Sequence, residues 1–114
     1  MHELSIAMSI VETAQEEAQQ RGLRVAAVHL RLGALAGVVK DSLLFSYEIA
    51  SQETPLAGSK LIIEDVPLAV FCQQCNAERT LDSIQNFTCP VCGTPSGKIV
   101  RGKELEVFAL EVSE

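Results

Sequence analysis

Apolar and polar residues in the first part of the chain recur with the period of an α-helix. Between residues 4 and 21, apolar side chains return every three or four positions, and polar side chains occupy most positions between them. Gly22 follows, and glycine commonly ends a helix because it adopts the left-handed conformation without strain. The pattern predicts an amphipathic helix over residues 4–21. The stripe expected to face the core consists of Leu4, Ala7, Met8, Val11, Ala14 and Ala18.

The period changes to two over residues 24–32, which predicts a β-strand. A short loop flanked by glycines follows. Asp41 is suited to be the N-cap of a second helix, which we expect to continue to about Ser51. Residues 52–59 contain a Thr-Pro pair and a glycine, so they are expected to form a loop.

Residues 60–71 form a second candidate strand that contains Pro67. Proline has no N–H to donate to a neighbouring strand, so an edge position or a bend is expected there. A last strand is expected over about residues 103–112. Its apolar positions change face between Val107 and Phe108, which indicates a bulge or an imperfect pairing.

Together these elements predict an α+β fold, in which two helices lie on a roughly three-stranded sheet and a small zinc-ribbon-like module is inserted. A chain of 114 residues suits such a domain with one appended module. The main domain is expected to comprise residues 1–70 and 100–114, with the last strand returning to its sheet. The inserted module comprises residues 71–99 and contains all four cysteines.

The chain is acidic, with a formal net charge of -6 at pH 7. Proteins that bind nucleic acid usually present a basic face, so this charge argues against that class of partner. No basic N-terminal region precedes an apolar stretch, and no run approaches the roughly 18 apolar residues of a membrane span. We therefore expect a cytoplasmic protein with neither a membrane nor a nucleic acid as its partner.

The cysteines form two Cys-x-x-Cys pairs, Cys72 with Cys75 and Cys89 with Cys92. Two such turns supply four thiolates in a tetrahedron, which completes the coordination of Zn²⁺ and leaves no position for water. The motif therefore predicts one structural zinc ion. The alternatives are a single iron in the same ligand set and a dithiol–disulfide switch, although the βαβ context of thioredoxin-like switches is missing.

The first three residues, Met1, His2 and Glu3, form a second candidate metal site. A histidine at a chain end is most often a solvated side chain. However, the α-amine, the His2 amide nitrogen and the His2 Nδ1 atom can close five- and six-membered chelate rings on one ion. Nitrogen-rich planar coordination favours Ni(II) or Cu(II). A remaining position is open to Glu3 or another donor, and such an exchangeable site suits metal delivery better than storage.

Four segments together resemble the hydrogenase nickel-incorporation proteins of the HypA/HybF type. They are the initial Met-His-Glu-Leu-Ser, Arg31-Leu32-Gly33 at a strand end, Asp41-Ser42-Leu43 at a helix start, and the paired Cys-x-x-Cys module. The resemblance covers essentially the whole chain in order. It implies a nickel metallochaperone without catalytic activity, built from a nickel-binding α/β domain and a zinc domain.

The resemblance also implies ligands and partners. Nickel ligation falls on Met1, His2 and Glu3, chiefly through the His2 side chain and the terminal backbone nitrogens, and Asp41 occupies the place of a further carboxylate. Zinc ligation falls on the four cysteines. The implied role is to pass Ni(II) to the large subunit of [NiFe]-hydrogenase with a nickel-handling GTPase, and in some organisms to serve urease. His29 matches no ligand position and is expected to be an ordinary surface residue.

The alternative function is that of a zinc-ribbon adaptor or redox protein in which the N-terminal residues have no nickel role. Nickel binding by the untagged protein distinguishes the two.

Overall fold

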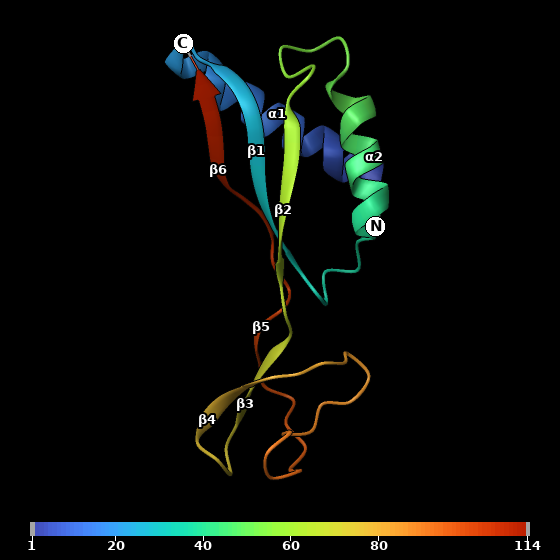
Figure 1. The fold of residues 1–114 in the computed structure, drawn as a ribbon, viewed down its shortest axis with the longest axis vertical. Coiled ribbons are helices and arrows are strands. Elements are labelled where there is room, and N and C mark those ends of the chain that lie inside the picture. Colours follow the sequence, from blue (N-terminus) through green and yellow to red (C-terminus); the bar gives the residue numbers. More distant parts are fainter. Residues whose placement is uncertain (1, 114) are drawn as a thin grey trace. The chain divides into compact units, whose positions relative to one another are not determined.

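The computed structural model describes residues 2–113, which form two compact units (Figure 1). The first unit contains the chain up to Leu30, Gly37–Glu64 and the chain from Glu106 onward. The second unit contains Arg31–Ala36 and Asp65–Leu105, and it holds the four cysteines. The chain therefore leaves the first unit twice and returns to it twice.

Two helices, α1 (Glu3–Arg21) and α2 (Lys40–Ser51), pack against each other in the first unit. Helix α1 ends where Gly22 adopts the left-handed conformation, with φ at 65°. The helix predicted over residues 4–21 and its end at the glycine are therefore confirmed. Neither helix of the described chain has the length and apolar composition needed to cross a membrane.

The buried face of α1 differs in part from the predicted stripe. Leu4 and Met8 are 44% and 58% exposed, so the prediction that they face the core was wrong. At about 100° per residue the buried residues of α1 span an arc of roughly 100°, and Met8 lies outside that arc. The stripe continues instead through an isoleucine that the prediction left out. The buried residues of α1 are Ala7, Ile10, Val11, Ala14 and Ala18.

Helix α2 begins earlier than the sequence predicted. Its N-cap is Val39, which has no polar side chain to offer the helix, and Asp41 lies inside the first turn. The assignment of Asp41 as the N-cap was therefore wrong. A carboxylate in the first turn still interacts favourably with the positive end of the helix dipole, which explains an aspartate at this place.

The sheet of the first unit has three strands in the order β2-β1-β6, visible side by side in Figure 1. They are β1 (Arg24–Gly33), β2 (Lys60–Val66) and β6 (Leu105–Ser113). The predicted return of the last strand to this sheet is confirmed. In β1 the consecutive residues Ala27 and Val28 are both buried. Because neighbouring side chains point to opposite faces, both faces of β1 are covered at this point.

The second unit has its own antiparallel sheet in the order β4-β3-β5. Its strands are β3 (Ala69–Cys72), β4 (Ala77–Thr80) and β5 (Ile99–Arg101). Pro67 and Leu68 separate β2 from β3, so the single strand expected over residues 60–71 is interrupted at the proline. The sequence analysis predicted neither β4 nor β5.

A small apolar cluster supports this second sheet. Leu68, Val70 and Leu81 are buried at its centre. The partly buried side chains packed around them are Leu35, Phe87 and Ile99. Leu35 comes from the connection after β1, which explains how a cysteine segment with few large apolar residues acquires a core.

The connection after β1 is tied to the second unit through backbone contacts. The Gly33 N–H donates to the Glu104 carbonyl at 2.7 Å, and the Leu35 N–H donates to the Gly102 carbonyl at 2.6 Å. A Cβ atom on Gly33 would lie 2.2 Å from the Gly102 oxygen. Only glycine therefore fits at the end of β1.

Candidate metal centres

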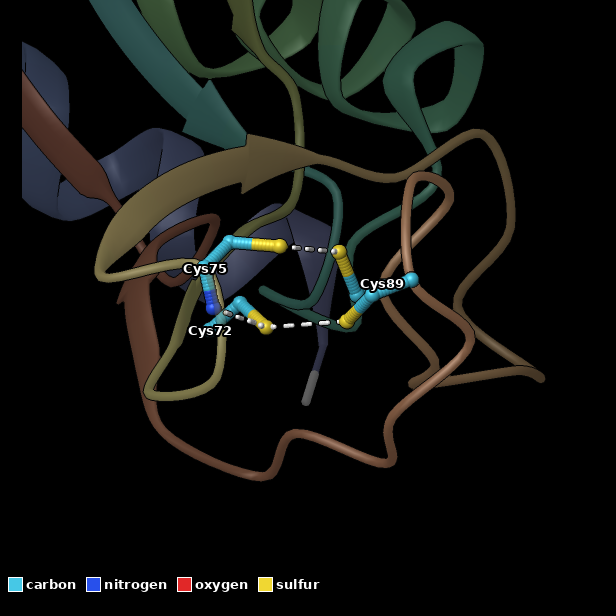
Figure 2. A group of neighbouring side chains, drawn as sticks. Cys72, Cys75 and Cys89 are labelled. Carbon is cyan, nitrogen blue, oxygen red and sulfur yellow. Dashed lines mark hydrogen bonds between the residues drawn. The ribbon is translucent and has the colours of Figure 1, made fainter.

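The four cysteine sulfurs lie together in the second unit. Cys72 ends β3, Cys75 lies in the turn before β4, and Cys89 and Cys92 come from a second turn. All four Sγ atoms lie within 4.8 Å of one another. Figure 2 shows the labelled cysteines pointing their sulfur atoms toward a common centre. The fold therefore brings together the four residues predicted to bind zinc.

The sulfur spacing fits a tetrahedral metal ion. The Sγ atoms of Cys72 and Cys92 are 3.5 Å apart, and those of Cys75 and Cys89 are 3.8 Å apart. All four cysteines are free of disulfides. Four sulfurs that each lie about 2.3 Å from one zinc ion are roughly 3.8 Å from one another in a tetrahedron. The cluster therefore fits one Zn²⁺, and the same ligand set also fits one iron ion.

Each Cys-x-x-Cys turn is followed by a residue in the left-handed region. Asn76 has φ at 54°, and Gly93 has φ at 76°. These residues reverse the chain so that both cysteines of a pair face the same centre. In the first turn the backbone N–H of Cys75 donates to the Cys72 sulfur at 3.5 Å. Backbone amides directed at sulfur favour the thiolate that a metal requires.

The environment of the cluster shifts the pKa values of the Cys75 and Cys89 thiols in opposite directions. Hydrogen bonding from the Cys92 backbone lowers the pKa of Cys89 to about 6. Arg79 lowers the pKa of Cys75, but hydrogen bonds to the other cysteines and burial outweigh this and raise it to about 11. Four thiols this close cannot all ionise without a cation among them. A divalent metal supplies that charge, so its binding releases protons.

Two neighbours of the cluster were missed by the sequence analysis. The Thr94 hydroxyl lies 3.2 Å from the Cys92 sulfur, and this contact contributes most to the lowered pKa of that thiol. The Arg79 guanidinium lies near Cys75 and Cys89, which raise its own pKa. Neither residue belongs to the cysteine motif, so only the pairing of β4 with β3 could have indicated Arg79.

The described part of the N-terminal site is His2 and Glu3, since Met1 lies outside the described residues. His2 is exposed and is the N-cap of α1. Its carbonyl accepts the first helical hydrogen bond, from the Ile6 N–H at 3.2 Å. The first amide groups of an α-helix have no partner within the helix. The backbone nitrogens of His2 and Glu3 are therefore not used by the helical ladder.

Glu3 lies beside the start of α2. Its Oε2 atom accepts a long hydrogen bond of 3.5 Å from the N–H of Val39, two residues before Asp41. Asp41 itself is exposed. Within residues 2–113, the four cysteines gather as metal-binding side chains, whereas His2, Glu3 and Asp41 do not. A nickel site at this end would therefore depend on backbone nitrogens as well as side chains.

His29 is occupied by neighbours within the first unit. Its Nε2 atom lies 2.6 Å from a carboxylate oxygen of Glu111, and its ring meets the Phe108 ring edge-on at 5.9 Å between centroids. The side chain is 26% exposed, so it is less open than the ordinary surface residue expected. This histidine is a natural control for experiments on His2.

The sequence matches a family model over nearly its whole length. The model, described as "Hydrogenase/urease nickel incorporation, metallochaperone, hypA", covers residues 1–112. The hydrogenase maturation factor HypA of Chloroflexus aurantiacus is 59% identical over 112 residues, covering 97% of this chain and 98% of the relative. The factor of the same name from Roseiflexus sp. is 50% identical over 115 residues, covering 100% and 94%.

Two solved structures share the fold. The solution structure of a HypA protein aligns with a TM-score of 0.72 and 21% identity, covering 99% of this chain and 97% of that one. The solution structure of the nickel metallochaperone HypA from Helicobacter pylori aligns with a TM-score of 0.66 and 21% identity, covering 97% of both chains. The predicted α+β fold class is thereby confirmed.

Proposed function

This chain belongs to the HypA family of nickel-incorporation metallochaperones in hydrogenase maturation, and from this we propose that it binds Ni(II) and delivers it to the large subunit of [NiFe]-hydrogenase. It does so without catalysis of its own, in the cytoplasm, where its thiols stay reduced. The nickel-binding domain is proposed to comprise residues 1–70 and 100–114, and the zinc domain residues 71–99.

The observation that carries the nickel proposal is the position of His2 at the N-cap of α1. An exposed imidazole stands there next to backbone nitrogens that the helix does not use. With the Met1 amine, these nitrogens supply the planar donor set that suits Ni(II). Glu3 is proposed to complete the set, and Asp41 in the first turn of α2 is a further candidate. An open site at a chain end allows nickel to leave again.

The zinc proposal rests on the donor chemistry of the cysteine cluster. Cys72, Cys75, Cys89 and Cys92 would hold one Zn²⁺, which cross-links the turn after β3 to the later turn. The ion would supply structural stability, since four thiolates leave no position for substrate. Zinc is proposed over iron because a structural role needs no redox activity.

Transfer of nickel to a nickel-free large subunit tests the delivery proposal. The untagged, nickel-loaded chain is expected to raise the nickel content of the large subunit. The incubation contains a zinc-saturated chelator, which captures nickel that is free in solution. The nickel content is read by mass spectrometry of the reisolated subunit. Equal loading from an incubation that contains the His2→Ala protein would contradict the proposal.

The exposed face of α1 is proposed to meet the nickel-handling GTPase partner. Glu12 and Glu16 are both exposed and lie one turn apart on that face. The paired change Glu12→Lys and Glu16→Lys reverses their charge and is expected to weaken binding by about tenfold or more, measured by co-purification or calorimetry. Unchanged binding would place the docking surface elsewhere.

A matched control places the same charge change on another surface. Glu48 and Glu53 are both exposed in the first unit, and their replacement by lysine is expected to leave the GTPase affinity unchanged. The family description also names urease, so a urease accessory protein is a second candidate acceptor for the same nickel.

A further inference from the structure

Arg79 occupies a core-facing position in β4. In the antiparallel pairing of β3 with β4, Arg79 is opposite Val70, and Ala77 is opposite Cys72. Opposed residues share a face of the sheet, and side chains two positions apart do so too. Arg79 therefore shares its face with Val70 and Cys72, both at 0% exposure. A cation beside such residues requires a partner, because desolvation without one is costly.

The partners of Arg79 are cysteine sulfurs. The Cys75 and Cys89 thiols lie near its guanidinium and raise its pKa, Cys75 the more strongly. Within the described chain its Nε atom is buried and makes no hydrogen bond. Arg79 is half-buried, and its Nε atom lies buried on the side of the sheet that carries Cys72.

A second arginine of the same unit shows the contrasting arrangement. Arg101 in β5 forms an ion pair with Glu78 at 2.9 Å, and both side chains are about half exposed. Exposed pairs of this kind contribute little to stability. Glu78 and Arg79 are neighbours in β4, so the strand directs one charge outward to Arg101 and the other toward the cysteines.

We propose that Arg79 is a positioning residue for the zinc centre, whose guanidinium offsets the net negative charge of four thiolates around one Zn²⁺. This inference rests on the proposed zinc site. Four thiolates and one Zn²⁺ leave a formal charge of about -2 in a partly buried place, and a hydrogen-bonding cation stabilises it. The positive charge stabilises the anionic zinc centre as a whole, so zinc is held more tightly, and it lowers the reactivity of the thiolates toward electrophiles.

Zinc competition with a chromophoric chelator at one neutral pH tests this role. The Arg79→Gln protein is expected to bind zinc about 10- to 100-fold more weakly, the usual cost of losing a group that supports metal ligands. Arg79→Lys keeps the charge and is expected to recover most of the affinity. Arg101→Gln removes a charge from the same unit without touching the sulfurs, so its affinity should equal that of the parent.

Two further measurements distinguish an effect of the Arg79 charge from a loss of folded structure. Cobalt-substituted proteins should retain the thiolate-to-cobalt absorption of a tetrahedral site in every variant that folds. Zinc-loaded Arg79→Gln should be alkylated by N-ethylmaleimide faster than the parent and the Arg101 control. The proposal is overturned if Arg79→Lys, with its cobalt spectrum intact, loses zinc as readily as Arg79→Gln. Equal affinities and alkylation rates in all four proteins would also overturn it.

These outcomes are distinct from a failure of the zinc assignment itself. A parent protein that binds no zinc, or that holds iron instead, would end the zinc proposal. If the parent binds zinc and substitution of Arg79 leaves the zinc affinity unchanged, only the inference about the arginine is overturned.

Discussion

The His2→Ala protein is expected to lose tight nickel binding, with a dissociation constant raised by more than about 100-fold. Loss of a group that merely supports a ligand costs up to about that factor, and this change removes a ligand itself. Zinc content and helix content should stay unchanged, because His2 is exposed and lies outside the second unit. Calorimetric titration with Ni(II) and metal analysis measure both quantities.

The matched control for this change is His29→Ala. These are the two histidines of the chain, and His29 is engaged with Glu111 on the sheet. Its loss should leave nickel affinity unaltered. Nickel binding to the parent should also weaken as the pH falls, because protons compete with the metal for imidazole and amine nitrogens. If the His2→Ala protein bound nickel as tightly as the parent, the nickel site could not be at the N-terminus.

The Cys75→Ala protein is expected to lose its zinc and the ordered structure of residues 71–99. Metal binding contributes on the order of 10 kcal/mol to the folding of small structural zinc sites. The apolar cluster around Val70 is too small to replace that contribution. Native mass spectrometry measures the zinc, and amide hydrogen exchange locates the unfolded segment.

The first unit should survive this change. Its core includes Leu43, Tyr47 and Leu56, none of which belongs to the cysteine unit. Far-ultraviolet circular dichroism should therefore retain the signal of α1 and α2. Val91→Ala is the matched control, since this side chain lies between two cysteines yet is 70% exposed and should keep its zinc. A zinc-free Cys75→Ala protein with residues 71–99 still protected would contradict the structural role of the metal.

The sequence was most informative where one local pattern decides the structure. The helical period and Gly22 located α1, and Pro67 located the interruption between β2 and β3. The spacing of the four cysteines indicated a cluster that the fold assembles. In each case the physical cause lies within a few residues of the feature, so no tertiary information is needed.

The sequence was less informative where tertiary packing decides. Leu4 and Met8 fit a helical stripe, but the face that α1 buries is set by its neighbours and excludes them. Asp41 has the chemistry of an N-cap, yet α2 begins at Lys40. The pairing of β4 with β3 places Arg79 on the face of the sheet that carries Cys72, and no motif marks it. These features depend on contacts between distant segments.

Nickel titration of a protein with two residues added before Met1 tests the central claim most directly. The extension keeps His2 but converts the terminal amine into an amide, which is a much poorer donor. If the terminal chelate carries the nickel, the extended protein should lose most of its affinity while its zinc content and circular dichroism match those of the untagged protein. Nickel binding by the extended protein as tight as that of the untagged one would contradict the account, and the ligands would then have to be side chains such as His2, Glu3 and Asp41.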